Sequence, residues 1–295
     1  MINIAVMLSG SGRYLDITQG LFKWWNNLYE DVNFSFYVST WEDDIDYNNF
    51  KWITKWERLK EEDCPYDLKN HPGTDHAPHY TYTLKKVNEL RNSHDVVFDA
   101  VLQTRCDYVF PKKLLDDMIS QVTQIRGGWD TRPYKQVSPR NIFSASGTSI
   151  HSAFREKINQ WKYDLWTNDY YFFGHPKVFD VFAKMFDYMY IDENTKGKLV
   201  PMMHIFQAEY LNLMGIYNTN LNSVNGVLIR EQERFEPHDT ITKDKDGNKI
   251  YQGGWDKNNP SPIQLQNMIN RHGVKWIYKD NNFDYIKSLF NRIPK

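Results

Sequence analysis

The sequence predicts an α/β fold in which helices flank a mostly parallel central sheet. Two apolar runs, residues 2–8 and 96–102, have the composition of strands, and a stretch with helical spacing lies next to each of them. Strands that alternate with helices are typical of a parallel sheet, because a helix carries the chain back to the start of the next strand. The run at 96–102 is apolar at nearly every position, which favours a central strand covered on both faces.

Length, charge and cysteine content limit the classes of function. The 295 residues can bury a sizeable core, and 36 basic against 37 acidic side chains give a net charge of −1, so no global charge attracts nucleic acid or an anionic membrane. The two cysteines, Cys64 and Cys106, lie too far apart for a metal or redox motif, which favours a reducing, cytoplasmic setting. No segment predicts a signal peptide or a transmembrane helix, and we expect a soluble protein.

The first predicted strand ends in a glycine-containing turn that leads into a predicted helix at residues 15–28. Glycines let the backbone approach a phosphate group closely, and the first turn of a helix offers N–H groups to an anion. The pattern predicts a nucleotide-binding turn made of Ser9, Gly10, Gly12 and Arg13. The third glycine and the later acidic residue of a dinucleotide motif are missing, so an ordinary tight turn is the alternative.

A second strand is predicted at residues 33–39, followed directly by Thr40 and Trp41. Both lie at the end of a strand, where α/β proteins bind ligands, and the ring of Trp41 could stack on a base or a sugar. Packing of Trp41 against the edge of the core is the alternative. Further along, Trp52 and Trp56 have helical spacing within a mixed pattern, and we expect both side chains to belong to the core.

Residues 63–79 form a proline-rich segment that contains three histidines and Asp75. A zinc site could be drawn here, but the sequence offers no second cluster of ligands to complete a tetrahedral shell, and a solvated loop is favoured. A helix is predicted next, at residues 78–92, and it leads into the central strand at 96–102.

The central strand is followed by Arg105 and Asp107. A carboxylate has no solvent to face along a central strand, so we expect Asp107 at its carboxyl end, where open α/β sheets bind their ligands. This pair of side chains suits a diphosphate group: Asp107 would bind a divalent cation, and Arg105 would pair with phosphate oxygen atoms. A simple salt bridge between Arg105 and Asp107 is the alternative.

The stretch between Arg126 and Lys157 is the most basic part of the chain. It follows a helix predicted at residues 114–122 and holds six Lys or Arg against two Asp or Glu, a net charge of +4. Its glycine, serine and proline content predicts a loop that could close over an anion, and a solvated surface loop is the alternative.

The remaining elements are predicted from shorter patterns. A strand is predicted at residues 168–174, with Asp169 at its start. Helices are predicted at residues 178–190 and 202–214, and the second helix contains Glu209. A late strand at 220–229 leads to Arg230. An Asp-Gly pair predicts a β-hairpin at residues 240–251, and short helices are predicted at 262–277 and 284–293.

Several of these segments, taken in order, resemble a group of bacterial and phage glycosyltransferases with a GT-A type fold. Residues 8–13 are similar to the SGQLR-like start of that group, and Ser39-Thr40-Trp41-Glu42 is similar to the end of its second strand. The tyrosine-rich helix and strand at residues 80–110 also match. Further similarity comes from an Asp-x-x-Phe-x-Gly pattern at 169–174, a Glu-x-x-x-Leu pattern at 209–213 and Ile229-Arg230.

The resemblance implies one GT-A-like domain over residues 1–295, with a donor-binding half at about 1–125, an acceptor half at about 126–295, a small β-hairpin and a helical C-terminal extension. It implies transfer of a sugar from a nucleotide-sugar co-substrate to an acceptor hydroxyl group of a saccharide or surface glycan. Asp169, at a strand boundary, is the preferred catalytic base; Glu209, in a helix, is the second candidate, with a structural salt bridge as its alternative. The donor would contact the glycine turn together with Thr40, Trp41, Arg105 and Arg230.

The resemblance also implies a divalent cation, Mn²⁺ or Mg²⁺, held by Asp107 and His238. In the group the cation is bound by an Asp-x-Asp signature, whereas this chain has Arg105 in place of the first acid. Only one carboxylate is therefore available at the signature, which weakens the expectation of a strong dependence on metal.

Two further functions remain open from the sequence. A phage-type DNA glycosyltransferase would share the donor chemistry, attach the sugar to a hydroxymethylated base and contact DNA phosphates through the basic stretch between Arg126 and Lys157. A non-catalytic protein that binds a nucleotide sugar or a glycan would keep the aromatic side chains and show no turnover.

Overall fold

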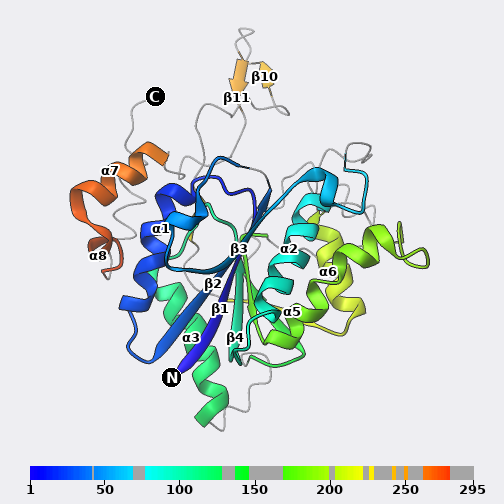
Figure 1. The fold of residues 1–295 in the computed structure, drawn as a ribbon, viewed down its shortest axis with the longest axis horizontal. Coiled ribbons are helices and arrows are strands. Elements are labelled where there is room, and N and C mark those ends of the chain that lie inside the picture. The colour runs from blue at the N-terminus through cyan, green and yellow to red at the C-terminus, as the bar shows by residue number, and fades with distance from the viewer. Residues whose placement is uncertain are drawn as a thin grey trace.

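The centre of the molecule is a seven-stranded sheet with the strand order β3-β2-β1-β4-β7-β6-β8 (Figure 1). The computed structural model describes residues 1–41, 43–68, 77–127, 137–145, 169–198, 203–221, 226–228, 241–243, 249–251 and 262–279. The sheet strands are β1 (Ile2–Gly10), β2 (Val32–Trp41), β3 (Ile53–Leu59), β4 (Ala100–Thr104), β6 (Asn141–Ser144), β7 (Tyr171–Gly174) and β8 (Tyr217–Asn220). Within this sheet β7 is antiparallel to both of its neighbours, and the other pairings are parallel. The predicted α/β class with a mostly parallel sheet flanked by helices is confirmed.

Helices cover both faces of the sheet (Figure 1). Side chains of β1 alternate between two cores: Ile4, Val6 and Leu8 belong to one, and Ala5 and Met7 belong to the other. Because both faces are covered, nearly every position of β1 is apolar. The first core is covered by α1 (Leu15–Trp24), α3 (Lys112–Gly127), α7 (Pro262–His272) and α8 (Val274–Ile277), and the second by α2 (Ala77–Asn92), α5 (Pro176–Phe182) and α6 (Met203–Leu213).

Two smaller strand pairs and several short helices complete the described structure. β5 (Tyr108–Val109) pairs antiparallel with β9 (Val227–Leu228). The predicted hairpin is found as β10 (Ile241–Lys243) paired antiparallel with β11 (Lys249–Tyr251). The short helices are η1 (Trp25–Asn27), η2 (Tyr47–Asn49), η3 (Glu61–Asp63) and the π-helix η4 (Asp187–Ile191). Among the described residues, no helix has the length and apolar character needed to cross a bilayer.

The central strand begins later than its composition indicates. β4 starts at Ala100, and the side chain of Val97, predicted to be buried, is 88% exposed. The backbone N–H of Asn3 donates to the carboxylate of Asp99 at 2.8 Å, and the N–H of Asp99 donates to the carbonyl of Asn3. The chain therefore joins the edge of β1 at Asp99, and the apolar residues before it lie outside the sheet.

Other predicted elements differ in extent or type. The mixed pattern around Trp52 and Trp56 is strand β3 rather than helix, and both rings pack against the first core as expected. The helix predicted at 178–190 is divided into α5 and η4, and the late strand predicted at 220–229 is replaced by β8 and β9. Residues 69–76 of the predicted proline-rich loop and the helix predicted at 284–293 lie outside the described residues.

Candidate active site

The direction of β7 brings two distant parts of the chain to one edge of the sheet. In the β4–β7 register Thr104 lies opposite Tyr171, so the residue that follows β4 is next to the residues that precede β7. Arg105 and Asp169, which are 64 positions apart, meet here. The ends of β1 and β2 reach the same edge, because both strands run parallel to β4 or to its neighbour. The predicted location of the site at the carboxyl ends of the parallel strands is where the charged side chains lie.

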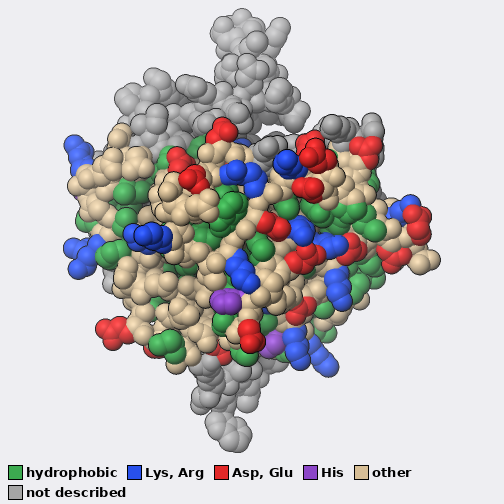
Figure 2. All heavy atoms as spheres, viewed as in Figure 1, with side chains coloured by type: hydrophobic (Ala, Val, Ile, Leu, Met, Phe, Trp, Pro, Cys, Tyr) green, Lys and Arg blue, Asp and Glu red, His purple; other side chains and the backbone are tan. Residues whose placement is uncertain are grey.

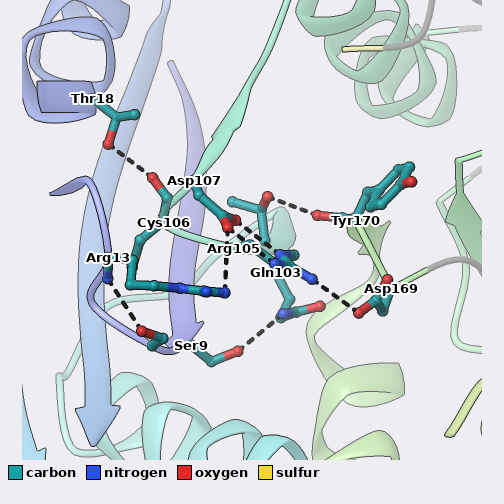
Figure 3. Close-up of polar contacts among 11 residues, drawn as sticks. Ser9, Arg13, Thr18, Gln103, Arg105, Cys106, Asp107, Asp169 and Tyr170 are labelled. Atoms are coloured by element: carbon teal, nitrogen blue, oxygen red, sulfur yellow. Dashed lines mark hydrogen bonds and ion pairs between the residues drawn. The ribbon is translucent and has the colours of Figure 1, made fainter. Parts of the chain in front are cut away.

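Four charged side chains gather at this edge, and we call Arg13, Arg105, Asp107 and Asp169 the strand-exit cluster (Figure 3). The guanidinium group of Arg105 donates from Nε to Oδ1 of Asp107 at 2.8 Å and from Nη2 to Oδ2 at 2.9 Å. Its Nη1 donates to Oδ2 of Asp169 at 3.2 Å. Nη2 of Arg13 lies 3.9 Å from Oδ2 of Asp107. The salt bridge that the sequence left as an alternative is therefore present, and it extends to a second carboxylate.

Burial and charge fix the state of Arg105. Its side chain is 21% exposed, and that of Asp107 is 6% exposed. Burial lowers the pKa of Arg105, but the carboxylates of Asp107 and Asp169 outweigh burial and raise it. The side chain of Arg13 is 48% exposed. The cluster thus presents one enclosed cation and one open cation to any ligand that reaches the edge of the sheet.

The glycine turn is built by close backbone packing. β1 extends to Gly10, so Ser9 and Gly10 belong to the strand, and Gly10 has φ +107°, in the left-handed region. A Cβ atom on Gly12 would lie 2.2 Å from Oδ2 of Asp43 and 2.5 Å from the hydroxyl of Tyr47. Glycine is needed at position 12 because a larger residue would displace Asp43.

Asp43 supports this turn from the end of β2. Its Oδ2 accepts from the hydroxyl of Tyr47 at 2.7 Å, and its Oδ1 accepts from Nη2 of Arg58 at 3.2 Å. No sequence motif singles out Asp43. Its contact with Gly12 depends on how β1 and β2 pair, and no local pattern announces that contact.

The start of α1 differs from a typical phosphate-binding helix. The backbone N–H of Leu15 donates to the carbonyl of Gly12, and those of Ile17 and Thr18 donate to the carbonyl of Tyr14. Tyr14 itself adopts a left-handed conformation with φ 63°. These amide groups are already used within the turn, so binding of an anion here depends mainly on the side chain of Arg13.

A chain of buried polar groups lies beneath the cluster on the α2 side of the sheet (Figure 3). Nε2 of Gln103 donates to the hydroxyl of Ser9 at 3.0 Å, and the hydroxyl of Tyr80 donates to Oε1 of Gln103 at 3.2 Å. The side chain of Gln207 in α6 lies near Tyr80. Burial raises the pKa of Tyr80, and Asp169 raises it further, so the phenol stays neutral. Ser9, predicted to contact the donor, is instead turned into this buried network.

Cys106, between the two charged residues, faces the opposite core. Its thiol is buried, and burial raises its pKa, so it is neutral at ordinary pH. Its carbonyl accepts from the hydroxyl of Thr18 at 2.8 Å, which ties the exit of β4 to α1. Cys106 therefore contributes to the position of Arg105 and Asp107 and has no reactive thiolate.

Two predicted donor contacts belong to the packing of the core. Thr40 is fully buried, and its hydroxyl is 2.8 Å from the hydroxyl of Tyr47. The Trp41 ring packs edge-on against His79 at 5.0 Å between ring centres, and its Nε1 donates to the His79 carbonyl. Thr40 faces the core because alternate residues of β2 do so. Trp41 packs against the side of α2, as the packing alternative predicted.

The other predicted site residues are placed as follows. Glu209 is buried in α6, two positions after Gln207, whose side chain lies near Tyr80. Arg230 and His238 lie outside the described residues, and so does most of the basic stretch between Arg126 and Lys157.

The described residues do not fit a divalent cation. No group of three His, Cys, Asp or Glu side chains with metal-binding geometry occurs in the part of the chain that the structure describes. Both oxygens of Asp107, the expected ligand, accept hydrogen bonds from Arg105. A cation at Asp107 would have to displace a buried guanidinium group of the same sign of charge.

The chain resembles solved structures of sugar-transferring enzymes. No protein-family model and no curated protein sequence matches it. The galactosyltransferase LgtC in complex with donor and acceptor sugar analogues has a TM-score of 0.40 and 14% identity, over 74% of this chain and 73% of that chain. An active-site mutant of LgtC gives the same values. A Desulfovibrio desulfuricans G20 protein described as a candidate nucleotide-diphospho-sugar transferase has a TM-score of 0.36 and 10% identity, over 75% and 80% of the two chains. At TM-scores below 0.5 the likeness concerns general architecture and identifies neither a donor nor an acceptor.

Proposed function

We propose that the chain is a glycosyltransferase that moves a sugar from a nucleotide-sugar donor to a hydroxyl group of a saccharide acceptor. The observation that carries this proposal is the strand-exit cluster. It combines two guanidinium groups and two carboxylates at the edge of the sheet where α/β proteins bind nucleotides. Transfer of a glycosyl group needs both kinds of charge: cations for the departing diphosphate and a carboxylate near the sugar carbon.

Arg13 and Arg105 are the residues proposed to receive the diphosphate. Arg105 is held rigidly by two carboxylates, so its guanidinium group is oriented before any ligand binds. Arg13 is more exposed and reaches toward the same carboxylate from the glycine turn. An anion between the two side chains would meet one fixed and one adjustable cation.

Asp169 is the residue proposed to accept the proton of the attacking hydroxyl group. It precedes β7, and its carboxylate is on the same guanidinium group that would hold the leaving diphosphate. Attack of the hydroxyl oxygen forms the new bond to the sugar carbon, and the bond from that carbon to the diphosphate oxygen breaks. The proton passes to Asp169, and the negative charge of the leaving group is balanced by Arg105 and Arg13.

The surface charge supports a saccharide rather than DNA as the acceptor. On the face shown in Figure 2, basic and acidic side chains of the described residues are interspersed, in keeping with the net charge of −1. An uncharged saccharide needs no basic surface, whereas binding along DNA depends on many phosphate contacts. We therefore keep the saccharide as the proposed acceptor.

The test uses purified protein and a panel of nucleotide sugars, with release of nucleoside diphosphate as the readout. We expect slow hydrolysis or transfer with one class of donor. Asp169→Asn should lower the rate about 100-fold or more, the range typical for loss of a general base, with donor affinity nearly unchanged. Glu193→Gln, which changes an exposed carboxylate, is the matched control. Full rates for both Asp107→Ala and Asp169→Ala would disprove the assignment, and donor binding without turnover would indicate a non-catalytic binding protein.

A further inference from the structure

The carboxylate expected to bind a metal ion is already neutralised by the chain itself. Asp107 is buried, and each of its carboxylate oxygens accepts a hydrogen bond from Arg105. This bidentate geometry is the strongest arrangement that a guanidinium and a carboxylate can form. A metal ion and Arg105 would therefore compete for the same two oxygen atoms.

We infer that Arg105 takes the place of the divalent cation, so that the diphosphate of the donor is bound by guanidinium groups without a metal ion. The inference rests on the proposed function and specifies the chemistry of the same site. The sequence resemblance implies that Asp107 binds a divalent cation, whereas in the structure Asp107 pairs with Arg13 and Arg105.

The charges of the cluster are balanced without a metal ion. Arg13 and Arg105 carry two positive charges, and Asp107 and Asp169 carry two negative charges, so the four side chains sum to zero. Two carboxylates with one divalent cation would also sum to zero. Before a donor binds, a divalent cation added to the present cluster would leave two uncompensated positive charges in a largely enclosed site.

Arg105 also keeps donors for a ligand. A guanidinium group has five N–H donors, and Arg105 uses three of them in hydrogen bonds to described residues. The remaining N–H groups are on Nη1 and Nη2, the two nitrogens next to Asp169 and Asp107. A phosphate oxygen bound there would be held by the same guanidinium group that contacts Asp107 and Asp169.

The first experiment measures binding of UDP, GDP, ADP and dTDP by calorimetry in EDTA and again with Mn²⁺. We expect one of these nucleotides to bind in EDTA, with a dissociation constant within about threefold of the value in Mn²⁺, a difference of about 0.65 kcal/mol or less. Electron paramagnetic resonance of Mn²⁺ should show no protein-bound ion when the nucleotide is omitted. Binding that requires Mn²⁺ would overturn the inference and leave the proposed function intact. Failure of all four nucleotides to bind under either condition would overturn both.

The second experiment changes Arg105. Arg105→Ala should weaken binding in EDTA more than tenfold, whereas Arg271→Ala, which removes an exposed arginine near the end of α7, should leave it unchanged. Arg105→Lys keeps the charge and guards against a folding defect, and it should weaken binding in EDTA without creating a need for Mn²⁺. Arg105→Asp creates the Asp-x-Asp signature at positions 105–107, and this variant should bind Mn²⁺ detectably by paramagnetic resonance. Unchanged binding in EDTA for both Arg105→Ala and Arg105→Lys would overturn the inference.

Discussion

Asp107 is held on both of its oxygen atoms by Arg105, the residue two positions before it in the chain. The same guanidinium group also contacts Asp169, so one side chain joins the exit of β4 to the start of β7. The position of Arg105 therefore depends on two carboxylates from distant parts of the sequence. Changing either one should affect both the stability of the fold and the binding of an anion.

Asp107→Asn tests how much the ion pair between Arg105 and Asp107 contributes to the stability of the fold. The amide keeps the shape of the side chain but loses the charge, and one N–H of Arg105 then faces an amide group rather than a carboxylate. Hydrogen bonds to charged groups contribute about 1.5–3 kcal/mol, so we expect the free energy of unfolding in urea to fall by about 2 kcal/mol. Glu193→Gln removes an exposed ion pair with Lys196 and should change it by less than about 1 kcal/mol. Equal effects of the two substitutions would contradict a structural role of Asp107.

Gly12→Ala tests the packing of the glycine turn. The added Cβ would lie 2.2 Å from Oδ2 of Asp43, so Asp43 or the turn must move. We expect a loss of about 1–3 kcal/mol in the free energy of unfolding and weaker nucleotide binding, because Arg13 follows the turn directly.

Gly20→Ala is the control for that substitution. A Cβ on Gly20 would meet Val274 at 3.7 Å, an ordinary contact, and the residue lies inside α1. Alanine is favoured over glycine in a helix, so Gly20→Ala should raise stability by up to about 1 kcal/mol. If both glycine substitutions had the same effect, close packing at Gly12 would not be the reason for its glycine.

The two thiols should differ in reactivity. Cys106 is fully buried, and burial raises the pKa of its thiol, whereas Cys64 is only half-buried. Titration of the native protein with a disulfide reagent at pH 8 should modify Cys64 slowly and leave Cys106 unmodified until urea unfolds the chain. Mass spectrometry of the digested protein identifies the site. Modification of Cys106 in the folded protein would show that the exit of β4 opens.

Glu57 provides a test by pH. Burial raises the pKa of Glu57 in the folded state, although Lys86 and the hydroxyl of Ser39 lower it. The folded state disfavours the ionised form of Glu57, so the free energy of unfolding falls as pH rises from the unfolded pKa toward the higher folded pKa. Below the unfolded pKa of about 4.3 the side chain is protonated in both states, and the free energy of unfolding is not reduced. Glu57→Gln has no charge to bury, so its unfolding free energy relative to wild type should increase from pH 4 to pH 7. An advantage that stays constant or falls with pH would contradict this assignment.

The sequence was sufficient to predict that charged side chains lie at the ends of the strands, but not that Arg105 pairs with Asp169 as well as with Asp107. Arg105 and Asp107 follow an apolar run, and Asp169 precedes another, so each could be assigned to the end of a strand. The contact between Arg105 and Asp169 depends on β7 running against β4, and a four-residue strand carries no signal for its direction.

Local patterns also failed where a side chain has a tertiary partner. Thr40 and Trp41 end a strand, as predicted, but Tyr47 and His79 engage them in packing. The close approach of Asp43 to Gly12 likewise joins residues that follow two different strands, and the pairing of β1 with β2 brings them together.

The reversed direction of β7 has a consequence for the order in which the protein is made. A ribosome that has synthesised the first 127 residues has produced four neighbouring strands, and the outer edge of β4 is still without its partner. Asp169 does not yet exist at that moment, so Arg105 has only one of its two acidic neighbours. The strand-exit cluster can form only after residue 174 has emerged, so the nascent first part of the chain is an incomplete sheet that depends on later sequence.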